Sequence, residues 1–346
     1  MSDHTKTSIV TLTAHVLEQQ RAHPEASGDL TLLLGAIQLG CKFVETCVRK
    51  ATLVSLTGLA GNINVQGEDV KKLDVLSNEM FVNALRQSGK VSVMVSEEID
   101  EPIIVGDGLT GKYCVTFDPL DGSSNIDAGV NVGTIFGIYK VKDSERGGSV
   151  EDVLRPGTEM VAAGYCMYGS SCNMLITLGN GVDGFTLDPA IGEFILTHPN
   201  INIPKRGKIY SVNEGNASLW DKATAAYFHS IKFPDPASGR KPYSARYIGS
   251  MVADVHRTFL YGGIFAYPAD KKSKRGKLRM LYECFPMAFL VEQAGGKATT
   301  GIERVLAQQP QNIHERGPIF LGSLQDVEDV ERIFAENPTI LNGTDQ

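Results

Sequence analysis

Two aspartates and a run of small residues stand together in the stretch FDPLDGSSN, residues 117–125. Asp118 and Asp121 lie three residues apart around a proline, and Gly122, Ser123 and Ser124 follow at once. Pro, Asp, Gly and Ser are common turn residues, so a turn explains part of this composition. A turn does not explain why two carboxylates are held so close together, and this pairing is what suggests chemistry.

Further acidic residues occupy comparable positions. Glu97 and Glu98 follow the apolar run VSVMVS, Asp118 ends the run YCVTF, and Glu283 lies in the apolar setting LYECF. Ligands of α/β sheets gather outside the carboxyl ends of strands, so these carboxylates converge if the two runs are neighbouring strands. Taken singly, each acidic pair is more simply a solvated turn. If they converge, two ionised carboxylates about 4 Å apart would repel each other by roughly 4 kcal/mol at an effective dielectric constant of about 20. Several such pairs would require a bound cation or protons.

Such a cluster offers hard oxygen ligands without histidine or cysteine, which favours Mg²⁺ or Mn²⁺ over zinc. The residues after Asp121 can supply a second function, because Gly122, Ser123 and Ser124 can present successive backbone N–H groups to an anion. Carboxylates that hold metal beside a phosphate-binding turn are suited to metal-assisted hydrolysis of a phosphate ester.

The whole chain limits the class of protein. Its 346 residues are 42% hydrophobic and 21% charged, which is ordinary for a soluble globular protein of one large or two medium domains. The net charge of −7 predicts no general attraction to nucleic acid or to an anionic membrane. The start MSDHTKTSIV lacks a secretory signal pattern, and the six cysteines form no C-x-x-C pair. Reduced cysteines in the cytoplasm are therefore expected.

The elements that must position the acidic residues are predicted from periodicity. Apolar residues at helical spacing predict helices at 27–53, 70–87, 216–230, 247–260, 278–294 and 324–336. Short β-branched and aromatic runs predict strands at 91–98, 112–118, 133–141, 160–168, 173–178, 184–188, 193–198, 209–213 and 318–322. Residues 56–69 are rich in Gly and Asn and are expected to form a mobile loop. Strands interleaved with long helices predict a layered α/β fold, with a boundary near 198–207.

At this level of detail the sequence resembles a known family. FDPLDGSSNID and GKLRMLYECFPMAFLVEQAGG (276–296) closely resemble the corresponding motifs of class I fructose-1,6-bisphosphatases. The resemblance extends over nearly the whole chain through GEDVKKLDVLSN (67–78) and PYSARYIGSMVADVHRTFLYGGIFAYPADKKS (242–273). Inositol monophosphatases and other lithium-sensitive phosphatases share the metal arrangement, but typically have a DPIDGT-like turn and a shorter chain.

The resemblance implies a fold, an activity and an assembly. The fold would be a layered α-β-α-β-α sugar-phosphatase fold with mixed sheets. An N-terminal allosteric domain (1–200) would carry most metal ligands, and a C-terminal domain (201–346) would bind fructose 1,6-bisphosphate. The implied activity is Mg²⁺-dependent hydrolysis of the 1-phosphate in gluconeogenesis, with Mn²⁺ as a substitute and AMP as allosteric inhibitor. The implied assembly is a homotetramer, a dimer of dimers.

The resemblance also implies individual roles. The metal ligands would be Glu68, Glu97, Asp118, Asp121, Glu283 and the Leu120 carbonyl, and the water-activating pair would be Asp74 and Glu98. The 1-phosphate would bind the Gly122, Ser123 and Ser124 turn near Arg279, and the 6-phosphate and sugar would contact Asn213, Tyr247, Met251, Tyr267, Lys277 and Arg246. Arg246 would enter from the neighbouring subunit. The family commonly has Asp where this chain has Glu68, so a different approach of this loop to the metal is expected.

Two basic features have simpler explanations when taken alone. The run KKSKRGKLR (271–279) has the composition of a solvated charge run, yet Lys277 and Arg279 are followed by Glu283 in the same segment. The implied AMP site comprises Ser27, Gly28, Asp29, Thr31, Lys112, Tyr113 and Lys140. The family usually has Thr, Glu and Arg where this chain has Ser27, Asp29 and Lys140, and a lysine loses the bidentate geometry of arginine at phosphate. Without a ligand, Ser-Gly-Asp would be a helix cap.

Two alternatives remain at this stage. The chain could act on a related substrate, as sedoheptulose-1,7-bisphosphatases and inositol phosphatases do. It could also be a catalytically silent AMP sensor or scaffold on the same fold, against which the intact set of carboxylates argues. Phosphate release from a substrate panel, with Mg²⁺ or with EDTA, distinguishes these functions.

Overall fold

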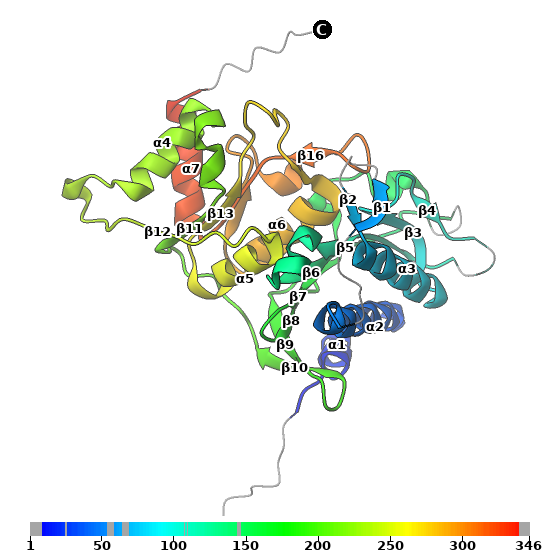
Figure 1. Cartoon of the computed structure of the whole chain (residues 1–346). Coiled ribbons are helices and arrows are strands. Elements are labelled where there is room, and N and C mark those ends of the chain that lie inside the picture. Colours follow the sequence, from blue (N-terminus) through cyan, green and yellow to red (C-terminus); the bar gives the residue numbers. More distant parts are fainter. Residues whose placement is uncertain are drawn as a thin grey trace, which may run out of the picture.

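The protein is built of alternating layers of helices and strands in the order α-β-α-β-α, as the family resemblance implies (Figure 1). A computed structural model describes residues 9–24, 26–53, 59–63, 69–106, 108, 110–143 and 147–338. The fold is therefore α/β with mixed sheets, and its two large sheets come from successive parts of the chain.

The larger sheet has eight strands in the order β10-β9-β8-β7-β6-β5-β3-β4. These strands are β3 (Val91–Ser96), β4 (Ile103–Ile104), β5 (Tyr113–Asp121), β6 (Val132–Lys140), β7 (Ala162–Tyr168), β8 (Cys172–Thr177), β9 (Asp183–Asp188) and β10 (Glu193–His198). Strands β3 and β5 are parallel, and the other neighbours are antiparallel. Every residue of β3 is buried, because helices cover both faces of the sheet.

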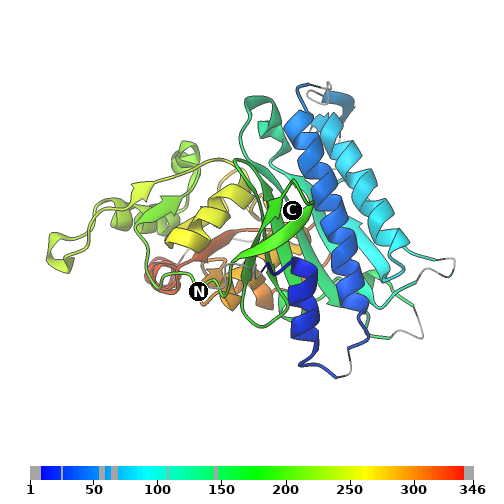
Figure 2. The ribbon, with the colours of Figure 1, turned by 90° about the horizontal axis from the view of Figure 1, so that it is seen from below.

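Three helices cover the outer face of this sheet (Figure 2). They are α1 (Leu12–Gln20), α2 (Asp29–Lys50) and α3 (Lys72–Gln87). Leu33, Ile37 and Val44 of α2 join the hydrophobic core beneath them. By length and composition alone α2 could cross a membrane, a test that core helices of water-soluble proteins also pass. Here α2 packs against α3 and β7.

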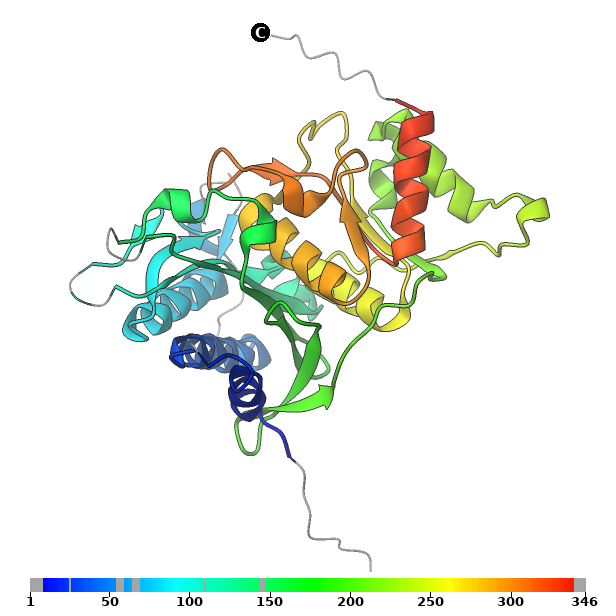
Figure 3. The ribbon, with the colours of Figure 1, turned by 180° about the vertical axis from the view of Figure 1, so that it is seen from behind.

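A second layer of helices lies between the two large sheets (Figure 3). It consists of α5 (Met251–Tyr261) and α6 (Phe285–Gln293), and α6 is buried almost throughout. Beyond it lies a five-stranded sheet in the order β12-β11-β13-β17-β15. Its strands are β11 (Ile209–Ser211), β12 (Ser244–Ala245), β13 (Ile264–Tyr267), β15 (Lys297–Thr299) and β17 (Ile319–Gly322). Helices α4 (Lys222–Lys232) and α7 (Leu324–Glu336) form the last layer.

The structure corrects several predicted elements. Part of the expected loop at 56–69 is strand β1 (Leu59–Ile63), which pairs with β2 (Asp69–Lys71), so the following helix begins at Lys72 rather than at residue 70. The helix expected at 216–230 is a 3₁₀ turn, η4 (Glu214–Leu219), followed by α4, and the helix expected from 247 begins at Met251. The short strands β4, β12, β13 and β15 were not predicted, because so few residues show no clear alternation.

The long helix predicted at 278–294 is divided into three elements. Residues Leu278–Arg279 form strand β14, which pairs with β16 (Arg316–Gly317), and a π-helical turn, η6 (Met280–Cys284), precedes α6. A run of buried apolar residues cannot distinguish strand from helix by periodicity, which explains the error. The π-helical turn places Glu283 in the interior.

Candidate active site

The acidic residues converge because β3 and β5 are parallel neighbours. Ser96 at the end of β3 pairs with Phe117, so Glu97 and Glu98 emerge from the sheet beside Asp118. Strand β5 continues to Asp121 with a register irregularity after Asp118. The carboxyl ends of parallel strands meet at one edge of a sheet, which is the condition that the sequence argument required.

Glu283 reaches the same place from the middle layer of helices. The buried hydroxyl of Thr116 on β5 donates a hydrogen bond of 2.8 Å to the carbonyl of Leu281, which ties the π-helical turn η6 to the strand. Carboxylate oxygens of Asp118, Asp121 and Glu283 lie within 4.8 Å of one another, and all three residues are buried. π-helical turns of this kind often occur at functional sites.

One buried arginine lies among these carboxylates. The Arg279 guanidinium is 3.0 Å from the Glu97 carboxylate and 3.8 Å from that of Glu283, and its backbone N–H donates to Glu283 Oε2 at 2.6 Å. Glu97 is thus an ion-pair partner of Arg279, and it also forms a hydrogen bond with Asp118. Arg279, expected from the resemblance to approach the 1-phosphate, is paired with Glu97 in this structure. Among the described residues that line this part of the structure, the acidic side chains outnumber the basic ones, Lys71, Lys277 and Arg279, so the negative charge is only partly compensated.

The pKa values reflect this excess of negative charge. Burial, followed by the Glu97 and Asp121 carboxylates, raises the pKa of Asp118 well above its usual range. Burial is also the main cause that raises the pKa of Asp121 to about 7 and that of Glu283 to about 8. Burial raises the pKa of Asp74 to about 6, although a hydrogen bond from the Lys71 backbone N–H acts to lower it. Buried carboxylates with raised pKa values favour either protons or a bound cation.

The small-residue turn lies directly beside the cluster. Gly122 has φ of +77°, and a Cβ there would lie 3.2 Å from the Ser250 hydroxyl, so glycine fits both the backbone and the space. The 3₁₀ helix η1 (Ser123–Ala128) begins at the next residue, and the first N–H groups of a helix have no partner within it. Asn125 fixes the turn by donating to the Gly249 carbonyl at 3.1 Å.

These groups line one cavity of about 660 Å³. It contains most of the predicted site, namely Asp74, Glu97, Glu98, Asp118, Leu120, Asp121, Gly122, Ser123, Ser124, Tyr247, Met251, Tyr267, Lys277, Arg279 and Glu283. Asn213 lies in a small adjoining depression that shares Tyr267. Arg246 is exposed and is not among the lining residues. Glu68 lies outside the described residues.

Other residues that line the cavity were not predicted from the sequence, namely Lys71, Gly249, Asp254, Phe265 and Leu278. The carboxylate of Asp254 is fully buried, accepts the N–H groups of Ile248 and Gly249, and pairs with Arg257 at 2.7 Å. It therefore fixes the segment that carries Tyr247. An aspartate inside the apolar run MVADVHRTF was the available signal, since an unpaired charge is rarely buried.

A different charge pattern occurs at the start of α2. The Asp29 carboxylate lies 2.7 Å from Lys90 Nζ and 3.1 Å from Lys112 Nζ, and it accepts a 2.6 Å hydrogen bond from Ser27. Gly28 is the N-cap residue, with φ of +81°. These hydrogen bonds hold the pKa of Asp29 far below its usual range. Lys90 was not predicted for this site.

The other residues expected there are also nearby. Burial, with Asp29 as a second cause, raises the pKa of Tyr113, and the register of the sheet pairs Tyr113 with Lys140. The Thr31 hydroxyl donates to Gln20 at 3.1 Å. Ser27, Asp29, Lys112 and Tyr113 are thus brought together, while Lys140 is exposed on the neighbouring strand.

The site defines a class of protein. Buried oxygen ligands that fit a metal, beside a glycine-serine turn in a layered α/β fold, are the parts of a metal-dependent phosphatase. The family described as "Fructose-1-6-bisphosphatase, N-terminal domain" matches residues 10–199, and "Fructose-1-6-bisphosphatase, C-terminal domain" matches residues 203–335.

Similar proteins agree with this class. The chain is 64% identical over 334 residues to the cytosolic fructose-1,6-bisphosphatase of Oryza sativa subsp. indica, covering 96% of this chain and 98% of the relative. It is 61% identical to that of Solanum tuberosum over 334 residues, covering 96% and 97%. A crystal structure of Leishmania major fructose-1,6-bisphosphatase in holo form matches with a TM-score of 0.89 and 47% identity, covering 94% and 99%.

The chain belongs to the fructose-1,6-bisphosphatase family. The resemblance noted in the sequence is thereby confirmed. The plant relatives are named cytosolic enzymes, in agreement with the cytoplasmic location expected from the sequence.

Proposed function

We propose that this protein hydrolyses the 1-phosphate of fructose 1,6-bisphosphate to fructose 6-phosphate and phosphate, as a Mg²⁺-dependent enzyme of gluconeogenesis. The observation that carries this proposal is the buried cluster of Asp118, Asp121 and Glu283 beside the Gly122 turn, in a chain of this family. The cavity of about 660 Å³ has room for a sugar bisphosphate.

The residues present fit a divalent cation. Asp118, Asp121 and Glu283 supply oxygen ligands within 4.8 Å of one another, without histidine or cysteine among them. Mg²⁺ would be held there, with the Leu120 carbonyl, Glu97 and Glu68 as proposed further ligands and Mn²⁺ as a substitute. When bound, the cation supplies positive charge at the phosphoryl oxygens and at the attacking water.

The chain's own groups perform the remaining tasks. Asp74 has a pKa of about 6, so its carboxylate is mainly ionised at neutral pH and can accept the proton of the attacking water, together with Glu98. Asp74 Oδ1 is buried and makes no hydrogen bond within the described part of the chain. The N–H groups at Gly122, Ser123 and Ser124 would hold the phosphoryl group as the bond from phosphorus to the sugar oxygen breaks.

Lysine and tyrosine side chains in the cavity lining would bind the 6-phosphate. Lys277, Tyr247 and Tyr267 line the cavity, and Asn213 adjoins it through Tyr267. Met251, also in the lining, would contact the sugar. These contacts do not change during the reaction, so they determine which bisphosphate binds rather than the rate of bond cleavage.

Arg246 is proposed to complete the site of a neighbouring subunit in a homotetramer, a dimer of dimers. The segment between α4 and α5 extends away from the body of the protein (Figure 1). Within its own chain the Arg246 guanidinium contacts the adjacent Ala245 carbonyl, at 2.8 Å. Arg246 directly follows β12, the edge strand of the five-stranded sheet, and its backbone N–H donates to the Tyr210 carbonyl at 2.9 Å. An exposed guanidinium at a sheet edge suits phosphate bound by another chain.

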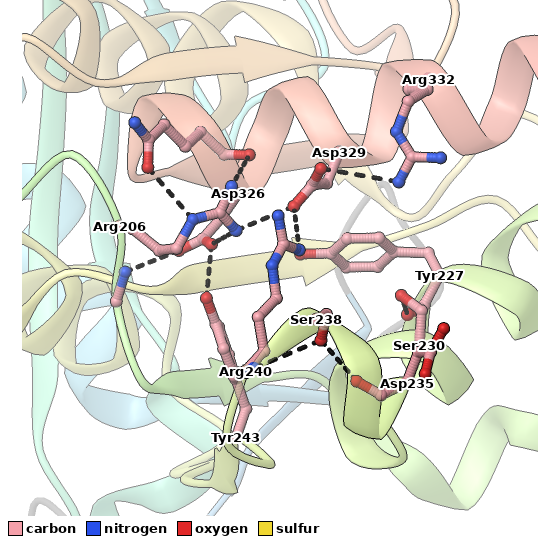
Figure 4. A network of polar contacts seen from close by, with 12 residues as sticks. Arg206, Tyr227, Ser230, Asp235, Ser238, Arg240, Tyr243, Asp326, Asp329 and Arg332 are labelled. Carbon is pink, nitrogen blue, oxygen red and sulfur yellow. Dashed lines mark hydrogen bonds and ion pairs between the residues drawn. The ribbon is translucent and has the colours of Figure 1, made fainter.

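A polar network anchors this segment to α7 (Figure 4). Arg240 pairs with Asp329 at 2.8 Å, and the Tyr243 hydroxyl donates to Asp326 at 2.6 Å. Arg206 pairs with both aspartates, at 3.0 Å and 2.8 Å. The network fixes the base of the segment that presents Arg246, which supports a defined position for the guanidinium.

Mixed tetramers test the shared site. Subunits with Arg246→Ala are combined with subunits disabled by Asp118→Asn but carrying an intact Arg246. Arg246 acting in trans predicts that mixing restores the low KM of the wild type at some sites. A mixture with the KM of the Arg246→Ala homotetramer would contradict a shared site.

AMP is proposed to inhibit by binding at the start of α2, remote from the metal ligands. The free N–H groups of a helix N-terminus, with Lys90 and Lys112 close by, suit a phosphate monoester. Ser27, Gly28, Asp29, Thr31, Tyr113 and Lys140 are the further proposed contacts.

A substrate panel tests the proposed activity. Phosphate release is measured from fructose 1,6-bisphosphate, sedoheptulose 1,7-bisphosphate and inositol monophosphate, with Mg²⁺ or with EDTA. The proposal predicts preference for fructose 1,6-bisphosphate, loss in EDTA and no turnover by Asp118→Asn. Preference for another substrate would assign a different phosphatase activity, and no Mg²⁺-dependent release from any of them would contradict the enzymatic function.

A further inference from the structure

A histidine outside the cavity connects the two segments that carry its acidic residues. His314 lies in the loop between η7 (Val305–Ala307) and β16. Its Nε2 atom is 3.1 Å from the carbonyl oxygen of Ile99 and 3.2 Å from that of Asp100. Its Nδ1 atom is 2.8 Å from the hydroxyl of the buried Tyr282. The imidazole therefore touches the residues after Glu98 and the residue before Glu283.

The chemistry of the partners defines the direction of these hydrogen bonds. Carbonyl oxygens only accept, so Nε2 of His314 carries a proton and donates it to the carbonyls of Ile99 and Asp100. In the neutral imidazole, Nδ1 then accepts the hydroxyl proton of Tyr282. The result is a chain of hydrogen bonds from Tyr282 through His314 to the backbone after β3.

The two segments that His314 connects by these hydrogen bonds are each attached to further elements of the fold. The His314 loop is held to the Arg279 strand by pairing of β16 with β14, and the Met280 N–H donates to the Glu315 carbonyl at 2.7 Å. On its other side, the turn after β3 is held by Ser96, whose hydroxyl donates to Asn78 of α3 at 2.7 Å. The turn with Glu97 and Glu98 thus lies between an attachment to α3 and the contact with His314.

We propose that His314 is a positioning residue that holds the Glu97–Glu98 turn against the segment of Glu283. This inference rests on the proposed function, in which Glu98 accepts a proton and Glu283 holds metal. The turn after β3 and the turn η6 belong to different layers, so their relative position depends on contacts that cross between them. A displacement of about 1 Å in a catalytic group can cost roughly 10²-fold in rate.

Two amide substitutions separate positioning from mere packing. In His314→Gln the side-chain amide nitrogen can reach the place of Nε2 and still donate to the two carbonyls. In His314→Asn the shorter amide reaches only the place of Nδ1, so the contact with Ile99 and Asp100 is lost. We expect kcat to fall about 10- to 100-fold in the Asn variant, as for lost outer-shell partners of metal sites, with KM little changed. The Gln variant should keep most of the wild-type kcat.

A readout independent of turnover is amide hydrogen exchange in the metal-free protein. The account predicts faster exchange of the backbone amides at 97–101 in His314→Asn, but not in His314→Gln. The matched control is the pair of Tyr165 and His256, in which hydroxyl and Nδ1 lie 2.9 Å apart on other elements. His256→Asn should leave exchange at 97–101 unchanged.

The outcomes are distinct. The positioning role is overturned if the Gln and Asn variants have the same kcat and the same amide exchange at 97–101. This holds if both variants resemble the wild type, and also if both lose activity together with a fall in Tm. If the wild type releases no phosphate from fructose 1,6-bisphosphate, the proposed function fails by itself. The exchange comparison then still decides whether His314 holds the turn.

Discussion

The cavity cluster and the start of α2 place carboxylates in opposite electrostatic surroundings. In the cavity, Asp118, Asp121 and Glu283 share a buried site with one guanidinium, that of Arg279, and their pKa values are raised. At the start of α2, Asp29 alone lies between two lysines, and its pKa is lowered. The negative charge of the carboxylates thus exceeds the nearby positive charge in the cavity, whereas at the start of α2 the nearby positive charge exceeds that of the carboxylate.

This difference indicates the sign of the ligand that each region suits. A buried excess of carboxylates is relieved by a cation or by protons. Two lysines and a helix N-terminus around one carboxylate leave positive charge, which suits an anion. The two charge distributions therefore support binding of a metal ion in the cavity and of the AMP phosphate at the start of α2. Each assignment can be tested by its own substitutions.

The largest expected effect is that of Asp118→Asn. The substitution removes a charged ligand from the buried cluster and should abolish detectable Mg²⁺-dependent turnover, since metal assistance is worth several kcal/mol. Because Asn has nearly the size of Asp and places no charge in the buried cluster, the variant should fold and should have a Tm in EDTA at least equal to that of the wild type. Steady-state kinetics and thermal unfolding test both expectations. Substantial turnover with Mg²⁺ would remove Asp118 from the site.

The next effect is that of Glu98→Gln. The amide cannot accept a proton from water, so kcat should fall by roughly 10²–10⁴-fold. Glu98 is not part of the three-carboxylate cluster, so the affinity for metal should be retained. Turnover close to that of the wild type would leave Asp74 as the remaining candidate for the base.

The raised pKa values predict how stability depends on pH. In the metal-free protein, Asp121 and Glu283 have pKa values of about 7 and about 8, above their ordinary values. Between the ordinary and the raised values the folded state binds more protons than the unfolded state, so stability falls as pH rises. We expect Tm in EDTA to fall from about pH 6 to about pH 8, and saturating Mg²⁺ to raise Tm more at the higher pH. A Tm in EDTA that rises over this range would contradict the charge excess.

The smallest effect on catalysis is expected from a substitution at the start of α2. Lys112→Ala should raise the AMP concentration for half-inhibition about 10-fold, as expected for loss of a charge-assisted hydrogen bond. Uninhibited turnover should stay near that of the wild type, because Lys112 lies outside the cavity lining. Lys142→Ala is the matched control, an exposed lysine paired with Glu159. Competitive AMP inhibition that Lys112→Ala leaves unchanged would contradict a separate site.

The sequence predicted that the carboxylates after residues 91–96 and 113–117 converge if these runs are neighbouring strands, and the structure supplies that pairing. The residues of β3 and β5 have the pattern of strands in the sequence. Acidic residues that follow two parallel neighbouring strands lie at the same edge of the sheet and therefore meet. The contribution of Glu283 could not be derived from periodicity, because η6 lies within a continuous buried run that reads as one helix. Its place in the cluster came from the family resemblance.

Other features depend on contacts between distant segments. No local pattern relates Arg279 to Glu97, or Lys90 to Asp29, since these pairs form only when separate elements pack together. Asp254 differs, because its partners, the N–H groups of Ile248 and Gly249 and the Arg257 guanidinium, all lie within six residues of it. Sequence patterns thus located most groups of the cavity, but not the pairs that compensate their charges.

The most direct test of the comparison is equilibrium binding of Mn²⁺, followed by electron paramagnetic resonance, to wild type, Asp118→Asn and Asp29→Asn. We expect that the wild type and Asp29→Asn bind Mn²⁺ alike, and that Asp118→Asn loses this binding. Mn²⁺ binding that survives in Asp118→Asn, or that disappears in Asp29→Asn, would contradict the assignment of the cation to the buried carboxylates of the cavity.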